Sequence, residues 1–169
     1  MRRLANRGRA RVDEMKLLRF FSRQKKIIID RVVWRRVTRC ILERLLDCPE
    51  YELGIHFIDA AEMATVNETF LNHKGSTDVI TFNYQKRFST GKIHGEIYIS
   101  VPDAMTYARR FCVPWTHELA RYVVHGVLHL RGYDDTEPGL RRVMKREENR
   151  LVKELSGRFD LSKLARSCR

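Results

Sequence analysis

The sequence contains no run of about 18 apolar residues, the length at which a membrane-spanning helix becomes a candidate. Its basic N-terminus is not followed by the apolar stretch and small-residue cleavage site of a secretory signal, so we expect a cytoplasmic protein with no membrane partner. Cysteine is scarce, and Cys40, Cys48, Cys112 and Cys168 form no C-x-x-C pair. We therefore expect free thiols in a reducing compartment and assign none of them to a metal.

Acidic residues are too few to balance the basic ones. The chain has 33 Lys and Arg against 21 Asp and Glu, a net charge of +12. Residues 1–26 carry ten basic residues against two acids, which supplies +8 and leaves +4 for the other 143 residues. Such an arm commonly binds polyanions through counterion release, although a solvated tail has the same composition. We predict a basic N-terminal extension over residues 1–24, and Met15 offers a second translation start within it.

The length of 169 residues and the hydrophobic content of 43% suit one domain with a sizeable core. Alternating apolar residues predict a strand over 52–59, and runs of β-branched and aromatic residues predict strands over 26–30, 77–84 and 92–101. Helical spacing, capping residues and prolines predict helices over 31–46, 60–71, 102–111, from 115 or 116 up to Gly132, and 138–155. These elements predict an α+β fold: a single domain whose small mixed sheet of about four strands is surrounded by helices, one of which is buried and carries a metal.

The segment 122–135, YVVHGVLHLRGYDD, has the layout of a metal site built on one helix and the turn after it. His125 and His129 are four residues apart, so they lie on one face of a helix and both imidazoles can reach one ion. Gly132 stands where the helix has to end in a left-handed conformation. The chain that turns back there carries Asp134 and Asp135 toward the same point, and we predict Asp135 as the third ligand.

The helix that carries the histidines has one narrow polar face. This polar stripe consists of Glu118, Arg121, Tyr122, His125 and His129, and apolar residues cover most of the rest. A helix this apolar is largely buried, and an unpaired polar group in a dry interior costs about 1–3 kcal/mol. The stripe is therefore expected to line a cavity or to meet partners. The alternative is that both histidines are core residues with satisfied hydrogen bonds.

The sequence H-G-V-L-H-L-R-G-Y-D-D resembles the signature of the YbeY family of metal-dependent endoribonucleases, H-G-x-L-H-L-x-G-Y-D-H. The two agree at every defined position except the last, where Asp135 replaces a third metal-binding histidine. The ligand set that the resemblance implies is His125, His129 and Asp135. Zinc is the expected ion, one per chain, while nickel, manganese and iron stay open. The added negative charge should make a bound water less acidic than at a three-histidine site.

Two further segments extend the resemblance to about residues 25–155. TDVITF, at 77–82, resembles T-D-V-L-S-F, and His94-Gly95-Glu96-Ile97 resembles the start of G-D-I-x-I-S. Both are expected beside the metal, which makes Asp78 and Glu96 candidate proton acceptors. The family's loop arginine is replaced by Leu71. The candidates for binding the substrate are His73, Lys74 and Arg121.

The resemblance implies a single-strand-specific endoribonuclease that acts on ribosomal RNA in small-subunit maturation and ribosome quality control. The small ribosomal subunit is the expected partner, and residues 25–157 are the expected enzyme domain, followed by a tail at 158–169. The rival function is an RNA-binding or ribosome-binding assembly factor whose metal is structural. A zinc protease would need a glutamate at Gly126. A non-haem iron oxygenase has nothing else in the chain to support it.

The last predicted helix has a basic side. Its inward face is predicted to consist of Leu140, Val143, Met144, Glu147, Leu151 and Leu155. The outward residues are Arg141, Arg142, Lys145, Arg146 and Arg150. This basic side is either a solvated surface or a contact with RNA or the ribosome.

Overall fold

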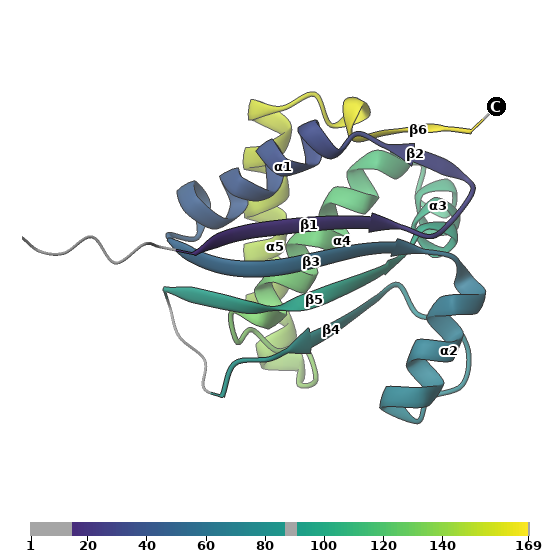
Figure 1. Ribbon diagram of the computed structural model, residues 1–169, viewed down its shortest axis with the longest axis horizontal. Coiled ribbons are helices and arrows are strands. Elements are labelled where there is room, and N and C mark those ends of the chain that lie inside the picture. The colour runs from purple at the N-terminus through teal and green to yellow at the C-terminus, as the bar shows by residue number, and fades with distance from the viewer. Residues whose placement is uncertain (1–14, 87–90, 169) are drawn as a thin grey trace, which may run out of the picture.

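A four-stranded mixed sheet forms the centre of the fold in the computed structural model, which describes residues 15–86 and 91–168 (Figure 1). The strand order is β1 (Lys16–Ser22), β3 (Glu50–Ile58), β5 (Lys92–Ser100) and β4 (Val79–Asn83). The first three strands are parallel to one another, and β4 is antiparallel to β5 at the edge. The predicted α+β fold with a small mixed sheet is confirmed.

The membership of the sheet differs from the prediction at both ends of the chain. Strand β1 lies within the segment assigned to the basic extension, yet it pairs with β3 from Lys16 opposite Tyr51 to Ser22 opposite Phe57. The predicted strand at 26–30 is β2 (Ile27–Ile29), which instead pairs with β6 (Ala165–Ser167) in a separate two-stranded sheet. Segments outside the expected range 25–157 therefore belong to the fold. Residues 1–14 of the predicted extension lie outside the described residues.

Helices α1, α4 and α5 pack on one face of the sheet, and α2 lies beyond the carboxyl end of β3 (Figure 1). The α-helices are α1 (Arg31–Arg39), α2 (Ala60–Leu71), α3 (Val101–Arg110), α4 (Trp115–Leu130) and α5 (Pro138–Arg158). Helix α1 continues as the π-helix η1 (Cys40–Leu45), and the 3₁₀ turn η2 (Leu161–Leu164) follows α5. In the described part of the chain, no helix combines the length and the apolar character that a membrane crossing requires.

Helix α4 is the most buried helix, and it lies very close to β5 at Gly126, a residue that has no side chain. Val123, Val124 and Val127 are fully buried. A Cβ at Gly126 would lie only 2.6 Å from Cγ2 of Ile97 in β5, so the helix and the strand can approach this closely only because residue 126 is glycine. This contact fixes the position of α4 on the sheet, and with it the positions of His125 and His129.

Candidate metal centre

The structure brings His125, His129 and Asp135 together at the carboxyl end of α4. The Nε2 atoms of the two histidines are 3.0 Å apart. One carboxylate oxygen of Asp135 lies 3.8 Å from Nε2 of His125, and the other lies 3.8 Å from Nε2 of His129. One potential ligand atom from each residue falls within a group no more than 4.8 Å across. The three side chains therefore form a group that could hold a metal ion.

The turn after α4 directs Asp135 toward the histidines. Gly132 has a left-handed φ of 90°, its N–H donates to the carbonyl of His129 at 2.9 Å, and the N–H of Tyr133 donates to the carbonyl of Leu128 at 3.0 Å. Asp134 then accepts hydrogen bonds from the N–H groups of Asp135 and Thr136, at 2.7 and 3.0 Å. Asp134 therefore stabilises the turn, and Asp135 is the aspartate that faces the two histidines.

The hydrogen bonds of the two histidine Nδ1 atoms determine which imidazole nitrogens are free to bind a metal. Nδ1 of His125 lies 3.1 Å from a carboxylate oxygen of Glu148, and Nδ1 of His129 lies 3.1 Å from the carbonyl of Tyr133. Both oxygens can only accept, so each Nδ1 carries the proton and each Nε2 has a free lone pair. Burial lowers the pKa of His129, and the nearby His125 lowers it further, which favours the neutral ligand form. Two lone pairs and one carboxylate converge, and this donor set fits a divalent cation.

Glu148 is a buried carboxylate, 4% exposed, that supports His125 from α5. Besides His125, it accepts hydrogen bonds from Nη1 of Arg121 at 2.5 Å and Nζ of Lys145 at 2.8 Å. Burial raises the pKa of this carboxyl group, but the hydrogen bonds from His125, Lys145 and Arg121 outweigh burial and lower the pKa to about 2. Glu148 is therefore ionised and orients the imidazole of His125.

A cavity of about 430 Å³ opens beside the ligand group. His125 and Asp135 line it together with Asp78, Arg121 and Arg141. Arg121 is engaged by Glu148 and Asn149, whereas Arg141 donates its Nε to the backbone carbonyl of Asp135 at 2.9 Å. Among the described lining residues, Arg141 thus keeps terminal N–H groups available for a ligand at the rim of the site.

The comparison with protein families agrees with this geometry. The family model described as Endoribonuclease YbeY matches residues 19–156. The chain belongs to the YbeY family. The match begins within β1, which is consistent with the sheet starting before residue 25.

Curated relatives named Endoribonuclease YbeY match different lengths of this YbeY-family chain. The relative from Chlorobaculum parvum is 44% identical over 92 residues, which cover 54% of this chain and 63% of the relative. The relative from Syntrophus aciditrophicus is 34% identical over 142 residues, covering 80% of this chain and 88% of the relative. The solution structure of TM1509 from Thermotoga maritima covers 84% of this chain and 91% of its own, with a TM-score of 0.61 at 23% identity. This last likeness concerns the fold alone.

The structure does not bring Glu96 to the YbeY ligand group, contrary to its prediction as a proton acceptor. On β5, Gly95 and Ile97 face α4, so Glu96 between them points to the opposite face of the sheet. There its carboxylate lies 3.2 Å from Nε2 of His56 and accepts a hydrogen bond from Tyr84 at 2.9 Å. The motif resemblance located the strand correctly but could not show which face the side chain occupies.

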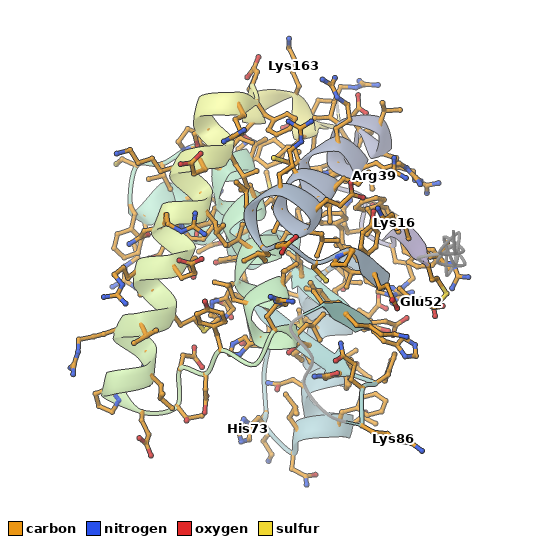
Figure 2. The ribbon with its side chains drawn as sticks, turned by 90° about the vertical axis from the view of Figure 1, so that its left-hand side faces the viewer. Lys16, Arg39, Glu52, His73, Lys86 and Lys163 are labelled. Carbon is orange, nitrogen blue, oxygen red and sulfur yellow. The ribbon has the colours of Figure 1, made fainter. Side chains whose placement is uncertain are left out.

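The other predicted site residues have different positions. Asp78 and Arg121 line the cavity beside the YbeY ligand group. His73 and Lys74 are exposed after the end of α2, and the described lining of the cavity includes neither of them. Their role in substrate binding stays a prediction. Figure 2 shows His73 at the end of the molecule opposite Lys163.

The sequence analysis missed Glu148 because it assigned the wrong phase to α5. Glu147 was predicted to face inward, but Glu148 is buried, and Leu140 and Val143, also predicted to face inward, are 44% and 45% exposed. The buried set is Met144, Glu148, Leu151, Val152 and Leu155. This set has helical spacing, but the apolar Leu140 and Val143 at the start of the helix favoured a face that contains Glu147 in place of Glu148.

Replacing Glu148 with glutamine should weaken zinc binding by about 10–100-fold, the usual effect of losing the partner that orients a metal-bound histidine. The amide removes the negative charge that holds the N–H of His125. Zinc affinity is measured by competition with a chromogenic chelator. Glu147→Gln is the matched control, because its carboxylate pairs with Arg150 outside the site and its loss should leave the affinity unchanged. Equal affinities for the two variants would show that Glu148 does not position His125.

Proposed function

We propose that this YbeY-family protein is a zinc-dependent endoribonuclease that cleaves single-stranded RNA in the cytoplasm. In our proposal it acts in the maturation of small-subunit ribosomal RNA and in ribosome quality control, with the small ribosomal subunit as its partner. The observation that carries the proposal is the convergence of two imidazole lone pairs and one carboxylate beside an open cavity. The name Endoribonuclease YbeY of the curated relatives supports RNA as the substrate.

His125, His129 and Asp135 would hold one Zn²⁺ per chain, through the two Nε2 atoms and a carboxylate oxygen. Two imidazoles and one carboxylate are a donor set that zinc accepts while it keeps a position open for water or substrate. When bound, the ion would supply Lewis acidity toward a phosphoryl oxygen and lower the pKa of water. Glu148 and the carbonyl of Tyr133 keep both histidines in the tautomer that this binding requires.

Two residues of the cavity wall are suited to act on an RNA phosphodiester. Arg141 lies next to Asp135 and offers N–H groups to phosphate oxygens, a role for which a guanidinium fork is well shaped. Asp78 uses one oxygen, Oδ1, to accept from Val79 N–H at 2.9 Å and from the Thr77 hydroxyl at 3.1 Å. Its other oxygen is the proton acceptor that we propose for the attacking water.

The size of the cavity favours an unpaired strand. At about 430 Å³ it falls in the range of pockets that enclose one small ligand. A nucleotide of a single strand can be splayed out of a stack and inserted into such a pocket, whereas a base-paired nucleotide has to be unpaired first. Single-strand specificity follows from this difference in cost.

The test is a cleavage assay with chelator-treated protein and with the same protein after zinc is restored. The substrates are an unstructured RNA and a hairpin of the same base composition. We expect cleavage only after zinc is restored, at internal positions and in unpaired segments. Tight RNA binding without zinc-dependent cleavage would contradict the enzyme and support an assembly factor whose metal is structural.

A further inference from the structure

A second basic site lies on α1, away from the metal ligands. Arg36 and Arg39 of α1, Arg44 of η1 and Arg158 at the end of α5 line a hollow of about 540 Å³, here called the arginine cleft. Figure 2 shows Arg39 and Lys163 toward one end of the molecule and His73 and Lys86 toward the other. The hollow thus joins the continuous segment of α1 and η1 to the end of α5, which is more than a hundred residues away in the sequence.

Helical periodicity explains why the arginines share one side of α1. The helix has the sequence RVVWRRVTR, and Trp34, Val37 and Thr38 are its buried residues. Arg35, Arg36 and Arg39 are exposed on the opposite side, together with Arg31. The packing of the apolar residues against the core therefore forces the arginines outward. The continuation of α1 into η1 adds Arg44, and the packing of α5 against η1 adds Arg158.

The positive charge of the arginine cleft is only partly neutralised within the protein. Glu43, the acidic residue in the described lining, accepts a hydrogen bond from the hydroxyl of Tyr51 at 2.5 Å. Arg158 pairs with Glu154 at 3.1 Å. Within residues 15–86 and 91–168, Arg36 and Arg44 have no carboxylate partner. Guanidinium groups gathered around one hollow repel one another unless an anion lies between them.

We propose that the arginine cleft binds backbone phosphates of the RNA whose cleavage is proposed above. Guanidinium groups bind phosphates through paired N–H donors, and they do so without reading the base sequence. Arg31, at the start of α1, lines a further hollow with Asp30, Lys163 and Arg166. Basic residues therefore stand at both ends of α1, which fits a polyanion better than a single phosphate. This inference rests on the proposed function only in taking RNA as the ligand.

The position of the arginine cleft suits an anchor for a long strand. Glu148, which contacts His125, and Arg158, which lines the cleft, are ten residues apart on α5, about 15 Å along the helix axis. An RNA strand of several nucleotides can span this separation. The arginine cleft would therefore increase affinity for long RNA, whereas a short oligonucleotide bound only at the metal centre would not reach it.

The test is RNA binding by the Arg36→Gln/Arg44→Gln variant of the full chain, measured by fluorescence anisotropy over a range of salt concentrations. A chelator is present so that the RNA stays intact. Each phosphate contact with a single strand contributes about 0.7 to the slope of log K against log salt, so the slope should fall by about 1.4. The matched control is Arg109→Gln/Arg110→Gln, an exposed adjacent pair on α3 with the same change of charge, whose slope should equal that of the unchanged protein.

Zinc content and cleavage of a short oligonucleotide should be the same in both double variants, which shows that they are folded. An unchanged slope for Arg36→Gln/Arg44→Gln would overturn the inference, as would binding to phosphatidylserine vesicles but not to RNA. If the slope falls but the unchanged protein cleaves no RNA, the arginine cleft stands and the proposed endoribonuclease fails. If the protein cleaves RNA but the slope stays, only the inference about the cleft fails.

Discussion

Replacing His129 with alanine should abolish both zinc binding and RNA cleavage. The substitution removes one of three converging donors and leaves only Nε2 of His125 and the carboxylate of Asp135. The loss of zinc affinity should exceed about 100-fold, because even losing an outer partner of a metal ligand costs about 10–100-fold. Zinc content after gel filtration should fall from one ion per chain to almost none, as measured by inductively coupled plasma mass spectrometry.

The matched control for this experiment is His94→Ala. His94 also pairs with a carboxylate, because its Nε2 lies 3.6 Å from Glu52, but it is on β5 on the opposite face of the sheet from α4. This variant should keep its zinc and its cleavage activity. Normal cleavage in His129→Ala would remove the basis for the proposed enzyme. Loss of cleavage with zinc retained would show that His129 acts on the substrate and not as a ligand.

Replacing Gly95 with alanine should destabilise the protein by about 1–3 kcal/mol or more. A Cβ at this position would clash with the backbone carbonyl oxygen of Phe82 in β4 and would lie 2.8 Å from Cδ2 of Leu130. The carbonyl is part of the neighbouring strand, so it can move only if β4 separates from β5. Leu130 directly follows His129, so the strain also reaches the metal helix. The melting temperature should fall by roughly 2–4 °C per kcal/mol in calorimetry.

The control for Gly95 is Gly157, a glycine with free space around it. Gly157 lies in α5, and a Cβ there would meet no atom within 4 Å. Gly157→Ala should therefore raise the free energy of unfolding by up to about 1 kcal/mol, the helix-propensity difference between the two residues. If Gly95→Ala melts at the same temperature as the unchanged protein, β4 does not pack on β5 as closely as described.

The replacement of a histidine by Asp135 changes the charge of the ligand group without preventing its assembly. The turn at Gly132 is what directs residue 135 toward the histidines, and this turn depends on backbone hydrogen bonds and a left-handed glycine. A carboxylate there has two oxygens, each 3.8 Å from one imidazole Nε2. The altered third position is therefore compatible with a metal site.

The predictions from sequence were wrong where the position of a residue depends on segments that are distant in the chain. Strand β1 was assigned to a basic extension because its charge outweighed the alternation of Leu18 and Phe20, which are buried against the remote segments of the core. The face occupied by Glu96 depends on which side of β5 receives α4. The phase of α5 depends on the three cationic or imidazole groups that surround Glu148.

The sequence by itself determined the spacing of His125 and His129 and the turn that returns Asp135, because helix periodicity and the left-handed glycine act over a few residues. The tertiary structure alone decided that Glu148 supports His125 and that arginines of α1, η1 and α5 share one cleft. Those arrangements join elements up to more than a hundred residues apart, and no local preference of the chain specifies which of them pack together.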